Sequence, residues 1–217
     1  MYGVSCMSSI SIETERQVLG NGDAFIKLSL PKLTENLGTL NKNFAAYYGK
    51  MHSGFTDYAN NKLAKAAAKR QGVPYGAALN TVMCHENENI ISLYTDLNVS
   101  DGTGNRYSRH GVLWHKPTGN IINPKTLFEK GAKKAVLQTL CRAAEEKSQS
   151  SSVPLFSDVR RRIKGNFRWA QFYISPAAAI FYYSGGLLNA DPKPFPLSFG
   201  EKELFTSEAR LMLWGLE

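Results

Sequence analysis

The stretch RHGVLWHKPTGNIINPKTLF, residues 109–128, carries more information about the fold than any other part of the chain. It places two histidines, His110 and His115, beside a tryptophan, a Pro-Thr-Gly-Asn turn and an apolar run that follows helix-capping residues. Two interpretations compete. Either the histidines belong to a metal or catalytic site, or the stretch is only a strand, a turn and the start of a helix.

The spacing of the two histidines argues against a shared metal ion. Residues five apart on a strand point to opposite faces of the sheet. Zinc sites need at least three protein ligands, and no third ligand lies nearby in the sequence. His52 and His85 are isolated. The sequence therefore predicts no metal site and no cofactor.

Composition is typical of a globular protein. The chain has 217 residues, 43% of them hydrophobic and 20% charged, which is enough for one large domain or two small ones. We interpret residues 1–217 as a single domain. A subdivision is also open, into 1–73 (a hairpin and a long helix) and 74–217 (a meander, helices and a C-terminal strand pair). No apolar run reaches the ~18 residues of a membrane-spanning helix.

The net charge of +8 permits an anionic partner such as nucleic acid, phospholipid or an anionic wall polymer. The first residues lack the basic start and apolar core of a signal peptide. The chain is therefore cytoplasmic, or it begins after a removed export segment. Cys6, Cys84 and Cys141 form no C-x-x-C pair, so one disulfide plus a spare thiol and three free thiols both stay open.

The first half of the chain predicts a hairpin, a long helix and a meander. Turn residues 20–23 separate strands around 10–12 and 25–30, and Pro31 ends the second strand. Thr34 is the expected N-cap of a helix over 34–71 whose glycines favour a bend near 49–54. The apolar stripe of that helix has helical spacing: Leu33, Leu37, Leu40, Phe44, Tyr47, Met51, Phe55 and Tyr58. Alternating residues over 75–115 then predict three strands.

The second half predicts a helix over 126–148, capped by Asn123 or Thr126, and a short basic helix over 157–165. Strands over 167–174 and 178–183, a long proline-rich loop over 190–199 and a closing helix over 201–214 complete the chain. The expected fold class is α+β, with an antiparallel β-sheet packed against one long and one medium α-helix.

Catalytic signatures are absent from the sequence. It has no G-x-S-x-G, H-E-x-x-H, phosphate-binding loop or dinucleotide-binding fingerprint. Glu86 and Glu88 can share one face of a strand end like paired acids, but exposed loop carboxylates have the same pattern and are much commoner. We therefore predict that the protein is not an enzyme.

The sharpest charge feature is a basic cluster with aromatic neighbours. Its members are Arg160, Arg161, Arg162, Lys164 and Arg168, beside Trp169, Phe167 and Phe172. Such interleaving is typical of a nucleic-acid surface. The favoured alternative is a solvated, arginine-rich helix face with Trp169 in the core. The cluster, Arg160 to Trp169, is the candidate binding site of this chain.

The order of these segments resembles a bacterial domain family of unknown function. That family forms the extracellular part of lysozyme-sensing anti-sigma factors and accompanies some polysaccharide deacetylases of Gram-positive bacteria. The matching motifs cover about residues 23–206: Arg109-His110-Gly111, Thr118-Gly119, Leu127-Phe128, Phe172-Tyr173-Ile174-Ser175-Pro176, Ile180-Phe181-Tyr182 and Phe195-Pro196-Leu197. The chain departs from the family at Pro176-Ala177-Ala178 and at Ser184-Gly185-Gly186, where proline-aspartate-glycine and proline-tyrosine are usual.

The resemblance implies that 109–128 is a strand, a turn and a helix start. It implies structural roles for a small set of residues: His110, Gly111, Gly119, Phe128 and Pro176. The implied function is a non-catalytic binding or sensing domain, extracellular or at the cell surface. A protein ligand or an anionic wall polymer is the expected partner. Lysozyme is disfavoured because both proteins are basic. The alternative is a basic intracellular protein that binds nucleic acid through residues 160–169.

Overall fold

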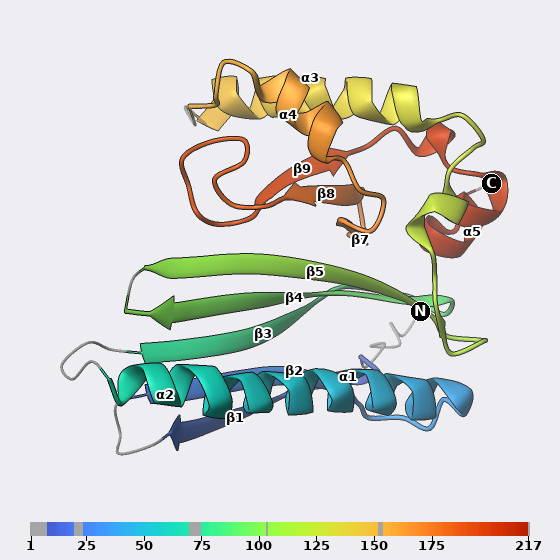
Figure 1. The fold of residues 1–217 in the computed structure, drawn as a ribbon. Coiled ribbons are helices and arrows are strands. Elements are labelled where there is room, and N and C mark those ends of the chain that lie inside the picture. The colour runs from blue at the N-terminus through green and yellow to red at the C-terminus, as the bar shows by residue number, and fades with distance from the viewer. Residues whose placement is uncertain (1–7, 20–23, 70–74, 103, 152–153, 217) are drawn as a thin grey trace.

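Two β-sheets pack face to face, and helices cover the outer face of each (Figure 1). The computed structural model describes residues 8–19, 24–69, 75–102, 104–151 and 154–216. The long N-terminal helix lies on one side of the sheet pair, and α3 (Lys133–Ser151) and α4 (Val159–Asn166) lie on the other. No helix in the described ranges is long and apolar enough to cross a membrane.

The large sheet has six strands in sequence order: β1 (Ile10–Leu19), β2 (Ala24–Leu33), β3 (Tyr75–Glu86), β4 (Ile90–Asp101), β5 (Asn105–His115) and β6 (Asn120–Ile121). The small sheet has three: β7 (Phe172–Ile174), β8 (Ala179–Tyr183) and β9 (Phe195–Phe199). The α+β class and the three-strand meander over 75–115 are confirmed. The division of the chain into domains stays a prediction.

The large sheet is mixed, which corrects the wholly antiparallel sheet expected from the sequence. β2 and β3 pair in parallel, from Ala24 opposite Tyr75 to Ser29 opposite Asn80. The other pairs in this sheet are antiparallel. The cause is the long helix between β2 and β3, because a helical crossover carries the chain back to the end of the sheet at which β2 began.

That helix is α1 (Thr39–Tyr58), continued by a π-helical turn at Ala59–Leu63 and by α2 (Ala64–Ala67). It begins five residues later than predicted. The N–H of Thr34 donates to the carbonyl of Ser9 (2.9 Å) and prolongs the β1–β2 pairing, so Thr34 is not the N-cap. Gly38, with φ 60°, turns the chain into the helix. The irregular segment follows Gly54, and the predicted end near residue 71 lies outside the described residues.

Pro31 does not end its strand. β2 continues to Leu33, with Pro31 opposite Ile12 of β1. Pairing with β3 stops at Ser29, so the side of β2 that faces β3 is free at Pro31. A proline is tolerated where no neighbouring strand needs its missing N–H.

The predicted helix over 126–148 starts late. Residues Pro124–Leu127 form a 3-10 turn, capped by the Asn123 side chain, which accepts from the N–H of Lys125 (3.1 Å). Gly131, with φ 86°, separates this turn from α3.

The region 190–199, predicted as a loop, contains the strand β9, in which Phe195, Leu197 and Phe199 alternate inward. The closing segment is a 3-10 turn (Lys202–Leu204) and α5 (Ser207–Trp214).

The two sheets meet at small residues. A Cβ on Gly111 of β5 would lie 2.1 Å from the carbonyl oxygen of Phe172 in β7. The Gly111 N–H donates to the Tyr182 hydroxyl (2.9 Å), and the N–H of Ile174 donates to Oγ of Ser92, a fully buried residue (2.8 Å). Any larger side chain at position 111 would push β7 away from β5.

We predict that Gly111→Ala lowers the free energy of unfolding by about 3 kcal/mol, because its Cβ collides with backbone atoms that cannot rotate away. Urea unfolding followed by circular dichroism measures this loss. The matched control is Gly54→Ala in α1, where a Cβ meets no atom within 4 Å. It should stabilise the protein by about 1 kcal/mol through helix propensity. Equal stability of Gly111→Ala and the parent would refute the close approach.

Candidate functional site

The opening stretch forms β5, a tight turn, β6 and the 3-10 turn at Pro124–Leu127. His110 is exposed, and Nδ1 of His115 lies 2.9 Å from Oγ1 of Thr118 within the turn. Among the described residues, no group of three or more His, Cys, Asp or Glu side chains is arranged to hold a metal ion. The geometry gives His115 a local role in shaping the turn.

Other residues of the resemblance have packing or backbone roles. Gly119 has φ 68°, and a Cβ there would lie 2.6 Å from the backbone nitrogen of Leu40, which fixes the turn against the start of α1. Phe128 packs on Phe205 and Trp169 at ring distances of 4.1 and 4.7 Å. Pro176 lies in the turn between β7 and β8. These residues build the scaffold on which a site can sit.

The predicted basic cluster lies on α4 and the residues after it, where several cations are paired. Nε of Arg160 is 2.5 Å from Glu145 of α3, and Nη2 of Arg161 is 2.5 Å from Asp158. Arg162 also binds Asp158 (2.6 Å), and its guanidinium lies 4.4 Å from the Phe156 ring centre. Hydrogen bonds from Arg161 and Arg162 lower the pKa of Asp158 to about 2.

The aromatic residues of the cluster face inward. The Trp169 ring lies 4.9 Å from Phe167 and packs against the core formed by the small sheet and its helices, as the favoured interpretation expects. The side chains that stay exposed form what we call the α4 basic surface: Arg160, Arg161, Lys164 and Arg168. This surface offers positive charge without a stacking platform.

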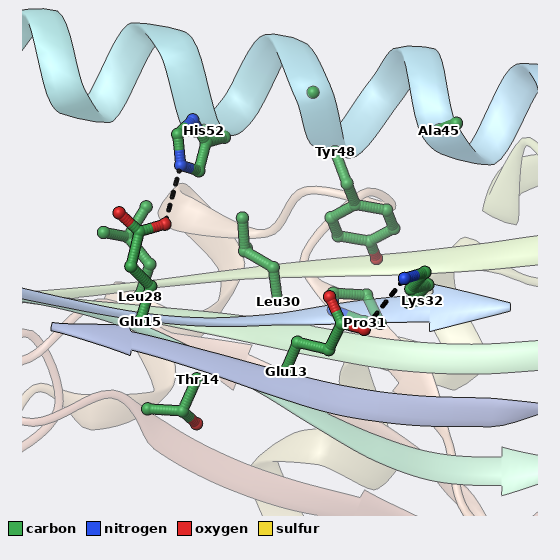
Figure 2. Close-up of a pocket in the computed structure, with 11 residues that line it drawn as sticks. Glu13, Thr14, Glu15, Leu28, Leu30, Pro31, Lys32, Ala45, Tyr48 and His52 are labelled. Atoms are coloured by element: carbon green, nitrogen blue, oxygen red, sulfur yellow. Dashed lines mark hydrogen bonds and ion pairs between the residues drawn. The ribbon is translucent and has the colours of Figure 1, made fainter.

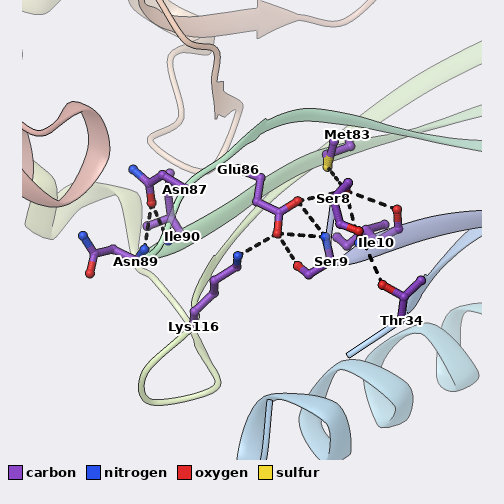
Figure 3. A network of polar contacts seen from close by, with 10 residues as sticks. All are labelled: Ser8, Ser9, Ile10, Thr34, Met83, Glu86, Asn87, Asn89, Ile90 and Lys116. Atoms are coloured by element: carbon purple, nitrogen blue, oxygen red, sulfur yellow. Dashed lines mark hydrogen bonds and ion pairs between the residues drawn. The ribbon is translucent and has the colours of Figure 1, made fainter. Parts of the chain in front are cut away.

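Glu86 and Glu88 do not act as a pair. Oε1 of Glu86 lies 2.6 Å from Nζ of Lys116, and both side chains are more than four-fifths buried (Figure 3). The hydroxyls of Ser8 and Ser9 also donate to the Glu86 carboxylate. Burial acts to raise the pKa of Glu86, but these donors outweigh it and the net pKa is lowered. Glu88 is exposed in the turn between β3 and β4.

An arginine–aromatic cluster that no sequence pattern indicates lies where β7 meets the large sheet. Arg109 of β5 makes two 2.7 Å hydrogen bonds to Asp96 of β4, its cross-strand partner. Its guanidinium lies 3.8 Å from the ring centre of Tyr94 and 5.8 Å from that of Tyr173 in β7. Arg109 and Asp96 are paired only through the register of β4 and β5. The residue types alone therefore did not indicate this ion pair. The cluster joins the two sheets.

Cys84 and Cys141 are free thiols, and Cys6 lies outside the described residues. Burial raises the pKa of Cys84 to about 12 and also raises the pKa of Cys141. A thiol must ionise to act as a nucleophile, so neither is activated at neutral pH.

A groove of about 410 Å³ opens between α1 and the first two strands (Figure 2). Its rim carries an ion pair between Glu13 and Lys32 (3.0 Å) and a hydrogen bond between Glu15 and His52 (3.2 Å). Its apolar lining includes Leu28 and Leu30 of β2 and Ala45 of α1, and Tyr48 also borders it. The hydrogen bond between His52 and Glu15 joins residues 37 positions apart, which sequence patterns did not bring together.

We predict that Glu86→Gln lowers the free energy of unfolding by about 2 kcal/mol at pH 7, because it leaves the Lys116 ammonium without its charged partner. The folded pKa of Glu86 is depressed, so its contribution is complete above the unfolded value of about 4.3 and is lost as pH falls through the folded pKa. The difference between variant and parent should therefore shrink towards pH 3.

Urea unfolding at pH 3, 5 and 7 tests this dependence. Glu88→Gln, two residues away and exposed, is the matched control and should stay within about 0.5 kcal/mol of the parent. A loss for Glu86→Gln that is the same at pH 3 and pH 7 would assign the effect to packing instead of charge.

Comparison with known proteins places the fold. No family model matches the sequence, and no curated protein matches it. Among solved structures, a DUF3298 family protein of Pseudomonas aeruginosa PAO1 superposes with a TM-score of 0.65 at 10% identity, over 92% of this chain and 95% of that one. A member of the same family from Bacteroides fragilis gives 0.65 at 10% identity, over 94% and 95%. The chain therefore has a DUF3298-like fold.

Proposed function

We propose that this protein is a non-catalytic binding domain that takes an anionic polymer on the α4 basic surface. The observation that carries the proposal is that the cationic side chains of this region are exposed whereas its aromatic side chains are not. Arg160, Arg161, Lys164 and Arg168 are exposed, while Trp169 packs inward. By the family resemblance, the place of action is the cell surface.

The state of the acidic and thiol groups supports a non-catalytic role. Glu86, Asp96 and Asp158 are each bound to a lysine or an arginine. A carboxylate held in this way is a poor general base, because its cation lowers its affinity for a proton. The half-buried Cys84 thiol has a raised pKa, which is the opposite of what nucleophilic catalysis requires.

The charge balance of the α4 basic surface supports a polyanion as ligand. Among the residues that the structure describes, two acidic residues, Glu145 and Asp158, form ion pairs with its cations, and both pairs are solvent-exposed on the arginine side. Exposed ion pairs contribute little and exchange readily with other anions. A phosphodiester chain can therefore displace them and release counterions as it binds.

Nucleic acid is the runner-up, because it is also a phosphodiester polyanion. Single-strand binders gain much of their affinity from bases stacked on exposed aromatic rings. The inward packing of Trp169 and Phe167 removes that contribution here. We therefore favour a wall polymer such as poly(glycerol phosphate), which has no bases to stack.

We predict that charge reversal of the α4 basic surface abolishes most of this binding. The variant Arg161→Glu, Lys164→Glu, Arg168→Glu leaves Arg162 in place, because Arg162 packs on Phe156 and binds Asp158. Affinity for labelled poly(glycerol phosphate), measured by fluorescence anisotropy at several salt concentrations, should fall at least tenfold. The slope of log K against log salt should fall by about 2, at roughly 0.7 per lost phosphate contact.

The matched control is Lys42→Glu, Lys50→Glu, Lys65→Glu on the long helix, which changes the net charge equally at exposed positions. It should keep most of the affinity. An equal loss in both variants would refute a site on α4. Tighter binding of an oligothymidine through the same residues would favour nucleic acid, and turnover of any glycan or peptide would refute the non-catalytic role.

A protein ligand is tested separately, by titration calorimetry against a common-type lysozyme at physiological salt. We expect no heat of binding, because both surfaces are basic. Micromolar or tighter affinity would overturn the charge argument and assign a sensor role.

A further inference from the structure

The outer edge of β1 is open. β1 is a terminal strand of the large sheet and spans ten residues, whereas the other terminal strand, β6, spans two. Within the described ranges no strand pairs with its outer side. Alternate N–H and C=O groups along such an edge have no partner in the sheet, so it can accept a further strand.

The groove described above lies directly beside this edge. Glu13 and Glu15 of β1 form one wall, and α1 forms the other (Figure 2). The helix leaves room because Ala45 and Gly49, one turn apart, are small, and a Cβ on Gly49 would meet no atom within 4 Å. A long side chain from an added strand can therefore pass over β1 and enter the groove.

The Tyr48 hydroxyl is a polar group that borders the groove and has no partner in the part of the chain that the structure describes. Tyr48 is only 4% exposed, lines the groove, and its hydroxyl has no hydrogen-bond partner among the described residues. In Figure 2 its ring points from α1 towards the strands. Burial raises its pKa, and the nearby indole N–H of Trp114 offsets this only in part without reaching hydrogen-bond geometry. Buried hydroxyls are normally paired, so a hydrogen-bonding group that reached the Tyr48 hydroxyl would stabilise the bound state.

The charge of the β1 wall of the groove favours a basic side chain in the ligand. Glu13 and Glu15 lie on the face of β1 that looks towards α1, because they contact Lys32 and His52. With the histidine neutral, these four residues carry a net charge of −1 in a chain of net charge +8. A lysine or arginine has both the apolar stem for Leu28 and Leu30 and the cation for the carboxylates.

The opposite face of β1 supplies apolar contacts. Ile12 is 41% and Val18 62% exposed. Both lie on the face away from α1, since successive side chains alternate across a strand. In a strand added beside β1, one residue lies opposite Glu15. The residues three positions before and after it would then lie opposite Ile12 and Val18 and cover them.

A second copy of β1 is disfavoured at this edge in the central registers, which overlap most. Antiparallel pairing centred on Thr14 places Glu13 opposite Glu15, and pairing centred on Glu15 places Glu15 opposite itself. Like charges directly opposite destabilise a strand pair. The acidic edge resists self-association and selects a basic partner.

We propose that β1 binds an extended peptide as an additional strand, with one lysine or arginine side chain of the peptide in the groove between β1 and α1. The peptide carries apolar residues three positions before and after that basic residue. This site lies in the layer opposite the α4 basic surface (Figure 1), and neither site depends on the other.

The probe is a set of acetylated, amidated peptides Ser-Val-Thr-Thr-Xaa-Thr-Thr-Val-Ser, in which Xaa is each of the twenty residues. Binding to the full chain is measured by fluorescence anisotropy. The arginine and lysine peptides should bind best and the glutamate and aspartate peptides worst. N-methylation of alternate peptide nitrogens should abolish binding in one of the two alternating sets, because it removes the donors that face β1. Absence of binding by every peptide, or indifference to Xaa, would overturn the proposal.

Two protein variants locate the site. Gly49→Leu fills the groove and should weaken the arginine peptide at least tenfold while raising the melting temperature. Its control, Gly54→Leu, adds the same side chain to α1 outside the groove and should keep the affinity. Glu13→Gln with Glu15→Gln should weaken binding about fivefold, and Glu88→Gln with Glu146→Gln should not. Unchanged affinity in Gly49→Leu would place the peptide elsewhere and refute the groove.

Discussion

The contact between Gly111 and the backbone of β7 sets the distance between the two sheets. At that point the chain of β7 passes so close to β5 that no side chain fits between them. The Tyr182 hydroxyl accepts the N–H of Gly111 from the large sheet, and the Ser92 hydroxyl accepts the N–H of Ile174 from the small sheet. The stacking of Arg109 between tyrosines of both sheets requires the same separation. The motif Arg109-His110-Gly111 is thus explained largely by packing.

Much of the fold was predictable because it is encoded locally. The predicted apolar stripe has the helical period. Three of its eight members, Leu40, Phe44 and Phe55, are buried in α1, and so is Tyr48, the neighbour of the predicted Tyr47. The alternation over 90–101 marks β4, and its burial follows that pattern only in part because both faces of the strand are covered near Ile90. The parallel pairing of β2 with β3 was not predictable from alternation, because alternation is the same in either direction. β9 was missed since Pro196 outweighed the pattern of Phe195, Leu197 and Phe199.

The candidate sites were predictable only where their residues are neighbours in sequence. The run Arg160 to Lys164 is visible as a charge cluster, but the partner of Arg160 is Glu145 in another helix. The groove beside β1 depends on Gly49, which the sequence analysis weighed only as a weak helix former. Its significance comes from position: it lies over β2 with empty space in front of it. The role of Gly49 in forming the groove depends on tertiary packing, which local sequence patterns do not encode.

The arrangement of the sheets also determines which surfaces are uncovered while the protein is being synthesised on the ribosome. Five of the strands of the large sheet, and the helix that covers one face, lie within residues 10–115. The strand that covers the other face at Gly111 begins only at Phe172. During synthesis these five strands are therefore made while β7 is still absent, so Leu113 and Tyr94 lack their cover for the time needed to make about sixty more residues. At ~5–20 residues per second this lasts several seconds, and in that interval a chaperone, or a second nascent chain, can reach a surface that β7 covers in the mature protein.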